Sequence, residues 1–208
     1  MLLPKEFELA KTALINSKVI AFPTETVMGL GVFFDDYNAY QLLNQIKERP
    51  EDKPYTLMLG SINDIDKFAH VTSRDLKIIK NLMPGELTIL LKSKSNVPGY
   101  VTHNTGVIGI RVPDMLLIQE LISYCGKPLL VPSANKSGHK PALTSNEVKE
   151  IFKDELGCII EGEAKGGVPS TIVDLTGEQV KILREGKITL EQILNVFRRH
   201  QYENCSWK

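Results

Sequence analysis

Residues 19–31 read VIAFPTETVMGLG, and this stretch decides how the fold is interpreted. The apolar residues 19–22 are typical of a buried strand, which Pro23 would end because proline lacks the N–H that a strand needs. Two hydroxyls and a carboxylate follow at residues 24–26, ahead of two glycines. Polar side chains at the end of a buried strand are where α/β proteins usually place ligand sites. We therefore expect residues 22–31 to form a loop that holds a small polar ligand.

The composition fits a globular α/β protein. Of the 208 residues, 42% are hydrophobic and 24% are charged, which is unlike a disordered chain. We expect one domain at residues 1–197 and a short, loosely ordered C-terminal tail at residues 198–208. The 25 basic residues balance 25 acidic ones, so no overall field attracts nucleic acid or a membrane. Any anion binding must come from a local cluster.

Cysteine usage predicts a reducing compartment. Cys125, Cys158 and Cys205 are far apart and odd in number, which matches neither a disulfide framework nor metal-ligand spacing. Charged residues and a proline at positions 4–6 interrupt the apolar centre that a signal peptide needs. No stretch approaches the roughly 18 apolar residues of a spanning helix. We expect a cytoplasmic protein with no membrane association.

Hydrophobic periodicity predicts alternating helices and strands. Helices are expected near residues 5–16, 37–48, 61–64, 74–82, 114–124, 144–153 and 189–198. Strands are expected near residues 18–22, 55–60, 86–92, 107–112, 128–131, 157–161, 170–175 and 179–183. Ser61, Asp114 and Thr144 (or Ser145) are the expected helix caps. Because several strands follow one another without a helix, a mixed sheet is favoured over a purely parallel one.

A basic segment, KERPEDKP at residues 47–54, is the second candidate site. Lys47, Arg49 and Lys53 lie within seven residues at the expected end of a helix. Cations are common at helix C-termini because they complement the helix dipole, so a solvated helix end explains them. Alternatively, the two prolines stiffen a loop that grips a phosphate. Spacing alone leaves both interpretations open.

Four further candidates lie in strands or beside them. The segment PSANKSG at residues 132–138 is either an anion-binding nest or a simple turn. The segment GGVPSTIVD at residues 166–174 and Arg184 are weak signals when taken alone. Arg111 is more informative because it lies in a β-branched strand. A charge there must emerge at the edge or end of the sheet or pair with an anion.

Six motifs occur together in the order and approximate spacing of one known family. They read FPTETVMGLG, KERPEDKP, GVIGIRVP, PSANKSG, PSTIVD and ILREG, and the resemblance covers about residues 5–190. The chain thus resembles the YrdC-like threonylcarbamoyl-AMP synthases, of the short, single-domain type. The resemblance implies a twisted mixed sheet with flanking helices around a concave, positively lined cavity.

The resemblance also implies a reaction. Members condense L-threonine, bicarbonate and ATP to threonylcarbamoyl-AMP and release pyrophosphate. A tRNA threonylcarbamoyl-transferase complex then completes the t6A37 modification of tRNAs that read ANN codons. Mg²⁺ would accompany the ATP without fixed protein ligands, and weak tRNA binding is compatible with the family.

Residue roles are carried over from the family motifs. For ATP, Lys47 and Arg49 would be the catalytic cations, and the nucleotide would contact Arg49, Lys53, Ser133, Asn135 and Arg184. For L-threonine, the implied contacts are Thr26, Arg111, Ser133 and Ser170, with Arg111 on the carboxylate.

Three positions depart from the family pattern. Many relatives have Tyr at the position of Met28, many longer ones have a threonine-contacting His at Met58, and Thr is common at Val107. Threonine selectivity is therefore less secure than nucleotide binding. Two alternatives stay open: a non-catalytic RNA-binding protein, and a paralogue of the same fold with another amino-acid specificity.

Overall fold

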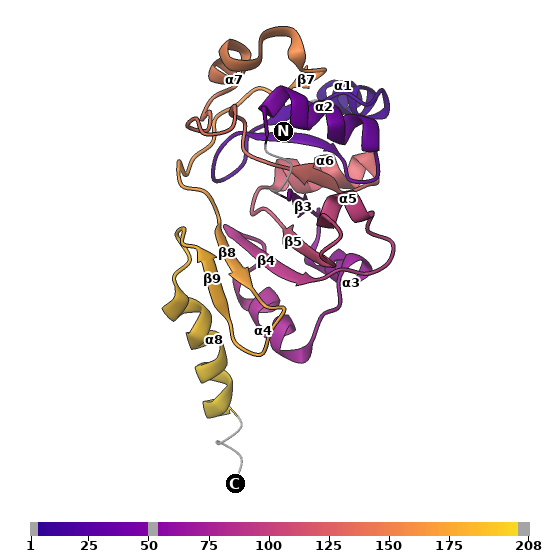
Figure 1. The fold of residues 1–208 in the computed structure, drawn as a ribbon. Helices are drawn as coiled ribbons and strands as arrows, with labels where there is room; N and C mark the ends of the chain where they lie inside the picture. Colours follow the sequence, from indigo (N-terminus) through magenta and orange to yellow (C-terminus); the bar gives the residue numbers. More distant parts are fainter. Residues whose placement is uncertain (1–3, 50–53, 204–208) are drawn as a thin grey trace.

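A nine-stranded mixed sheet organises the part of the chain that the structure describes. The computed structural model describes residues 4–49 and 54–203 (Figure 1). The strand order is β7 (Cys158–Ile159), β1 (Ile20–Phe22), β2 (Gly29–Phe33), β6 (Leu129–Val131), β3 (Thr56–Met58), β5 (Val107–Arg111), β4 (Leu87–Lys92), β8 (Thr171–Asp174), β9 (Lys181–Arg184). The pairs β1–β7, β3–β5 and β4–β8 are parallel, and the other five are antiparallel. The predicted mixed sheet is confirmed.

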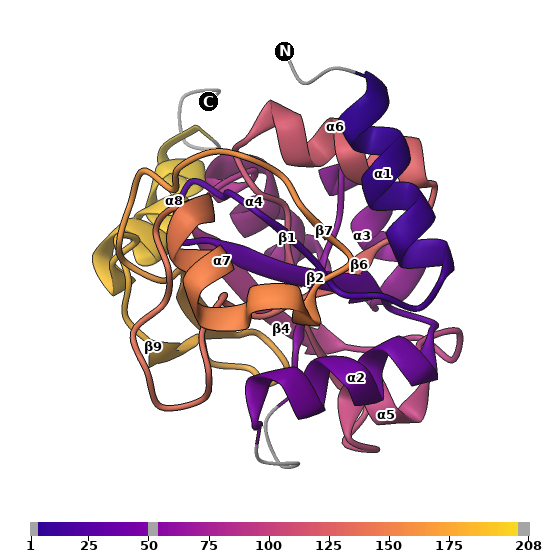
Figure 2. The ribbon, with the colours of Figure 1, turned by 90° about the horizontal axis from the view of Figure 1, so that it is seen from above.

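Helices surround this sheet. They are α1 (Pro4–Ile15), α2 (Tyr37–Lys47), α3 (Ile65–Phe68), α4 (Ser73–Leu82), α5 (Gly99–Thr102), α6 (Leu116–Cys125), α7 (Ser145–Phe152) and α8 (Leu190–Glu203), with 3₁₀ turns η1 (Ile62–Asp64) and η2 (Lys153–Glu155). Helix α1 lies beside α6 (Figure 2), and α4 lies beside α8 (Figure 1). In each pair, the two helices are far apart in sequence.

The core is divided by the sheet into two clusters. Ile20 and Phe22 belong to the cluster under α1 and α6, whereas Ala21 belongs to the larger cluster. In β6, Leu129 and Leu130 divide in the same way. Successive strand residues point to opposite faces, so β1 and β6 each supply both clusters.

The first two strands correct the prediction of a long loop at residues 22–31. Strand β2 begins at Gly29 and pairs antiparallel with β1, with Phe22 opposite Gly29 and Ile20 opposite Gly31. The glycines are therefore strand residues. A Cβ on Gly31 would lie 2.7 Å from Cε1 of Phe22, so the glycine makes room for the aromatic ring.

Most other boundaries of helices and strands agree with the prediction. Of the predicted helix caps, some are confirmed and others are not. Thr144 caps α7 by accepting the N–H of Glu147, as predicted. Asp114 does not cap α6, whose N-cap is Met115 without a side-chain bond. Ser61 caps only the turn η1 and forms no reciprocal capping box. The short helix α5 was not predicted, because four residues carry no usable periodicity.

Helix α8 runs past its predicted end at residue 198 and continues to Glu203. It therefore crosses the predicted boundary between the domain and the tail. Residues 204–208 of that tail lie outside the described part of the chain.

Candidate active site

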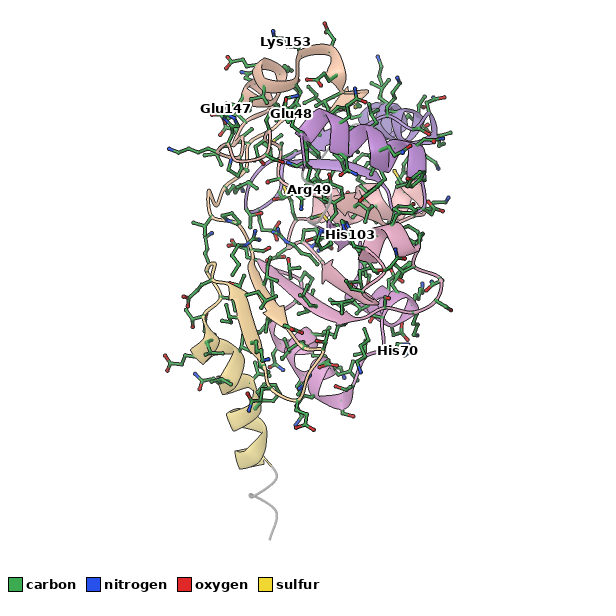
Figure 3. All side chains as sticks on the ribbon, in the orientation of Figure 1. Glu48, Arg49, His70, His103, Glu147 and Lys153 are labelled. Carbon is green, nitrogen blue, oxygen red and sulfur yellow. The ribbon has the colours of Figure 1, made fainter. Side chains whose placement is uncertain are left out.

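A cavity of about 190 Å³ brings together six of the side chains named from the sequence. They are Thr26, Arg49, Arg111, Ser133, Ser170 and Arg184. Five of them come from the end of a strand or from a loop beside one, and Arg49 follows the C-terminal end of α2. Figure 3 shows Arg49 below helix α2, on the side of strands β3 and β5. Among the described residues that line the cavity none is a carboxylate, so it favours anions.

The turn between β1 and β2 is held by the hydroxyl of Thr24. Its oxygen accepts the backbone N–H of Thr26 at 3.2 Å, and the hydroxyl donates to the carbonyl of Val27 at 2.7 Å. A hydroxyl carries one proton, so Thr26 must be the donor in the 2.9 Å contact between the two threonine hydroxyls. The turn therefore fixes the direction of the Thr26 hydroxyl.

Arg111 reaches the Thr26 hydroxyl from the end of β5. Both terminal nitrogens, Nη1 and Nη2, donate to Thr26 Oγ1 at 3.1 Å, and Nη2 lies 2.9 Å from Oε1 of Glu25. Arg111 is buried, lies at the last position of β5 and pairs with Glu25, so both predicted alternatives, a strand end and an anionic partner, hold. Thr26 Oγ1 thereby uses its proton and both lone pairs within the protein. A ligand contact through this oxygen would require Arg111 to release one N–H.

Lys47 lies in a buried cluster beside the cavity. Its ammonium donates to the carbonyl oxygens of Ser133 at 2.6 Å and Asn135 at 2.7 Å, and Asn135 Oδ1 is 3.4 Å away. Ser133 Oγ donates to the same Oδ1 at 2.6 Å. Burial, followed by the positive charge of Arg49, lowers the pKa of Lys47 to about 7. Lys47 and Asn135 shape the loop after β6 and do not line the cavity in this structure.

A left-handed residue separates Lys47 from Arg49. Glu48 ends α2 with φ 51° and ψ 44°, a conformation that L-residues other than Asn and Asp seldom adopt. The chain turns there, and Arg49 lies over the ring of Tyr55, 4.4 Å from its centroid. Arg49 Nη2 also donates to the carbonyl of Pro54 at 3.0 Å. The turn thus sends the lysine into the β6 loop and the arginine to the cavity.

The opposite wall is formed by β4, β8 and β9. Arg184 donates from Nε and Nη2 to the carbonyl of Ser170, at 3.0 and 2.8 Å, and from Nη2 to its hydroxyl at 3.2 Å. The Ser170 hydroxyl also contacts that of Thr88 at 2.9 Å. Burial, with a contribution from the nearby Arg111, lowers the pKa of Arg184. Arg184 and Arg111 therefore lie close together, and two neighbouring cations favour a bound anion.

The structure places the remaining predicted residues as follows. Lys53 lies outside the described part of the chain. Met28 and Met58, where the sequence departs from the family, both line the cavity. Thr88 and Tyr55 also line it and were not predicted. A polar residue inside the apolar run LTILLK is the signal that could have identified Thr88.

The described residues also bear on metal-dependent and membrane-spanning classes of function. Within residues 4–49 and 54–203, no group of three or more His, Cys, Asp or Glu side chains could hold a metal ion. Over the same residues, no helix combines the length and apolar character that crossing a membrane requires.

The fold and the cavity together define an α/β protein whose cavity is lined by three arginines and several hydroxyl groups. Residues 12–186 match the family model described as telomere recombination, which covers Sua5, YciO and YrdC. The chain belongs to this Sua5/YciO/YrdC family.

Relatives are similar over most of this chain. The threonylcarbamoyl-AMP synthase of Vibrio campbellii is 35% identical over 186 residues, which cover 88% of this chain and 100% of the relative. That of Pyrococcus abyssi is 34% identical over 183 residues, which cover 87% of this chain and 54% of the relative. The chain thus spans about half the length of the Pyrococcus protein.

Solved structures agree with the fold. Pyrococcus abyssi Sua5 complexed with L-threonine superposes with a TM-score of 0.90 at 32% identity, covering 94% of this chain and 58% of Sua5. Escherichia coli YciO superposes with a TM-score of 0.86 at 26% identity, covering 93% of this chain and 95% of YciO.

Proposed function

We propose that this protein is an L-threonylcarbamoyladenylate synthase, a nucleotidyltransferase that makes threonylcarbamoyl-AMP and pyrophosphate from L-threonine, bicarbonate and ATP. The observation that carries the proposal is the convergence of Arg49, Arg111 and Arg184 in one cavity with the three hydroxyl-bearing residues predicted from the sequence. The names of relatives that are 34–35% identical support it. So does the Sua5 structure with bound L-threonine.

The two ends of the cavity suit two different ligands. Arg111 is buried beside Thr26, and a buried guanidinium is suited to a carboxylate because it can bond both oxygens. We assign this end to threonine. Arg49 comes from the other wall and lies over Tyr55, and we assign it to the phosphates of ATP. Ser133 lines the cavity and would lie where the two substrates meet.

The chemistry requires no protein nucleophile. The amine of threonine attacks the carbon of bicarbonate, a C–O bond breaks and water leaves, which gives a carbamate. A carbamate oxygen then attacks the α-phosphorus, and the bond to the leaving pyrophosphate breaks. Arg49 and Arg184 would hold the phosphate oxygens and stabilise the charge that develops on them. Mg²⁺ would neutralise phosphate charge while bound to ATP. The described cavity lining supplies no carboxylate for Mg²⁺, and this fits an ion that arrives with the nucleotide.

The product indicates the partner of this protein, and its cysteines indicate the compartment. We propose that a tRNA threonylcarbamoyl-transferase complex consumes threonylcarbamoyl-AMP in t6A modification. Cys125 and Cys158 are unpaired among the described residues, which fits a reducing compartment, so we place the reaction in the cytoplasm. Cell fractionation followed by immunoblotting tests the location.

The reaction is tested by pyrophosphate release from purified protein with ATP and Mg²⁺. We expect release only when L-threonine and bicarbonate are both present, and we expect threonylcarbamoyl-AMP by mass spectrometry. Equal release without threonine would contradict the proposal. Salt-dependent tRNA binding without adenylate formation would instead favour a non-catalytic RNA-binding protein.

Altered amino-acid specificity is the second candidate. Met28 and Met58 place two thioethers in the lining, where many relatives have groups that form hydrogen bonds. The chain is also 29% identical to the uncharacterised Escherichia coli protein YciO over 170 residues. A panel of amino acids in the pyrophosphate assay separates the candidates, since a better substrate than threonine would favour the second.

A further inference from the structure

Glu25 is a largely buried carboxylate that the proposed reaction leaves without a role. It lies in the turn between β1 and β2, its side chain is 14% exposed, and it is not among the residues that line the cavity. Oε1 lies 2.9 Å from Arg111 Nη2 and accepts the backbone N–H of Asp114 at 3.0 Å. Oε2 is buried, and within the described residues it has no hydrogen-bond partner. A buried carboxylate with one free oxygen is costly, which favours a role beyond stability.

The contacts of Glu25 join two parts of the cavity wall. Asp114 follows β5, whose last residue is Arg111, and Glu25 precedes Thr26 in the turn. Glu25 therefore bonds the side chain of Arg111 and the backbone beyond it with the same oxygen. Arg111 meanwhile bonds Thr26 with both terminal nitrogens. The carboxylate and the hydroxyl together fix the plane of the guanidinium.

We propose that Glu25 is a positioning residue for the amino-acid end of the cavity. Its carboxylate holds the Arg111 guanidinium against Thr26, so that Arg111 meets the substrate carboxylate in one fixed orientation. Glu25 also balances the charge of Arg111 in the empty cavity, which lowers the cost of burying that cation. Glu25 acts through Arg111 and touches no substrate. The inference rests on the proposed function, because it takes an amino acid as the ligand of Arg111.

Two substitutions of Glu25 test the charge and the length of its side chain separately. Glu25→Gln keeps the shape and an oxygen that can accept from Arg111 and Asp114, and it removes the charge. Glu25→Asp keeps the charge and shortens the side chain by one methylene. If the carboxylate positions Arg111, both should raise KM for L-threonine about tenfold or more, as expected for weakening one charge-assisted hydrogen bond. KM for ATP and kcat at saturating threonine should stay close to wild type.

Glu86 provides a matched control. Its side chain is 18% exposed, it pairs with Lys187 Nζ at 2.8 Å, and its Oε2 is also buried without a partner among the described residues. Glu86 does not line the cavity. Glu86→Gln should therefore lower thermal stability about as much as Glu25→Gln and leave KM for threonine unchanged. The comparison removes general destabilisation as an explanation.

The outcomes are distinct. A KM for threonine within twofold of wild type in Glu25→Gln and Glu25→Asp overturns the inference, as does an equal rise in Glu86→Gln. If Glu25→Gln does not fold, Glu25→Asp decides. A wild type that binds L-threonine in calorimetry and releases no pyrophosphate contradicts the proposed reaction. In that case the same variants are compared by threonine affinity, and an unchanged affinity overturns the role of Glu25.

Discussion

The ammonium of Lys47 lies 2.6 Å from the carbonyl oxygen of Ser133, so the end of α2 is bonded to the loop after β6. The two residues are 86 positions apart in sequence. Lys47 also donates to the carbonyl oxygen of Asn135, so its main role is structural. Its influence on catalysis is expected to pass through Ser133, which lines the cavity.

The stability of the protein should depend on the protonation of Lys47. Its pKa is about 7 in the folded protein against 10.5 for an ordinary lysine, so the unfolded chain binds more protons between these values. Stability from this residue therefore rises with pH across that window. We expect the free energy of unfolding of wild type to rise relative to Lys47→Met between pH 7 and pH 9, measured by urea denaturation. A constant difference would contradict the lowered pKa.

Replacing Arg49 should weaken the binding of ATP more than the binding of threonine. Arg49→Ala removes charge-assisted hydrogen bonds to phosphate worth roughly 1.5–3 kcal/mol each, or about 10- to 150-fold in ATP affinity. Isothermal titration with ATP tests this. Arg74→Ala is the control, because Arg74 bonds the carbonyls of Leu175, Gly177 and Glu178 away from the cavity. Unchanged ATP affinity in Arg49→Ala would refute the assignment.

The protein should become more stable when Glu48 is replaced by glycine. Its left-handed φ of 51° costs about 1 kcal/mol or more for a residue with a Cβ, and its side chain is 72% exposed. We expect Glu48→Gly to raise the free energy of unfolding by up to about 1 kcal/mol, or roughly 2–4 °C in Tm. Glu48→Ala keeps the Cβ and should give no such gain in thermal denaturation. A lower Tm for the glycine variant would show that the weak pair with Lys136 matters more.

Gly31 should not tolerate a methyl group. A Cβ there would lie 2.7 Å from the ring of Phe22, and overpacking of this kind typically costs about 1–3 kcal/mol. Gly177→Ala is the control, since a Cβ at Gly177 meets nothing within 4 Å. Thermal denaturation of both variants compares the two positions, and equal Tm values would mean that the ring moves at little cost.

Local pattern predicted most elements of this fold, and contacts between distant residues decided where it failed. The cap at Thr144 depends on neighbours three residues away, so the sequence alone narrows it to Thr144 or Ser145. The strand at Gly29 depends on the ring of Phe22 across the hairpin, and glycines in an apolar run favour a loop until that ring is seen. Asp114 was a reasonable cap by type, and the structure instead uses its N–H to bind Glu25.

The candidate site was predictable as a set of residues and not as a geometry. Motif resemblance named Thr26 and Arg111, but the saturation of the Thr26 hydroxyl by Arg111 requires a contact across 85 positions. Thr88 was missed because its partner Ser170 is 82 positions away. The pairing of Glu25 with Arg111 has the same origin, since no local spacing links a turn after β1 to the end of β5.

The interleaved strand order has a consequence for how the site is made during synthesis. Strand β4 pairs with β8, and Arg184 comes from β9 at the edge of the sheet. A nascent chain that has left the ribosome only as far as Val131 already carries Thr26, Arg49 and Arg111 and lacks the whole wall of Ser170 and Arg184. The cavity is therefore completed late in translation, and under the proposed function ATP would stabilise the chain only after β9 has docked.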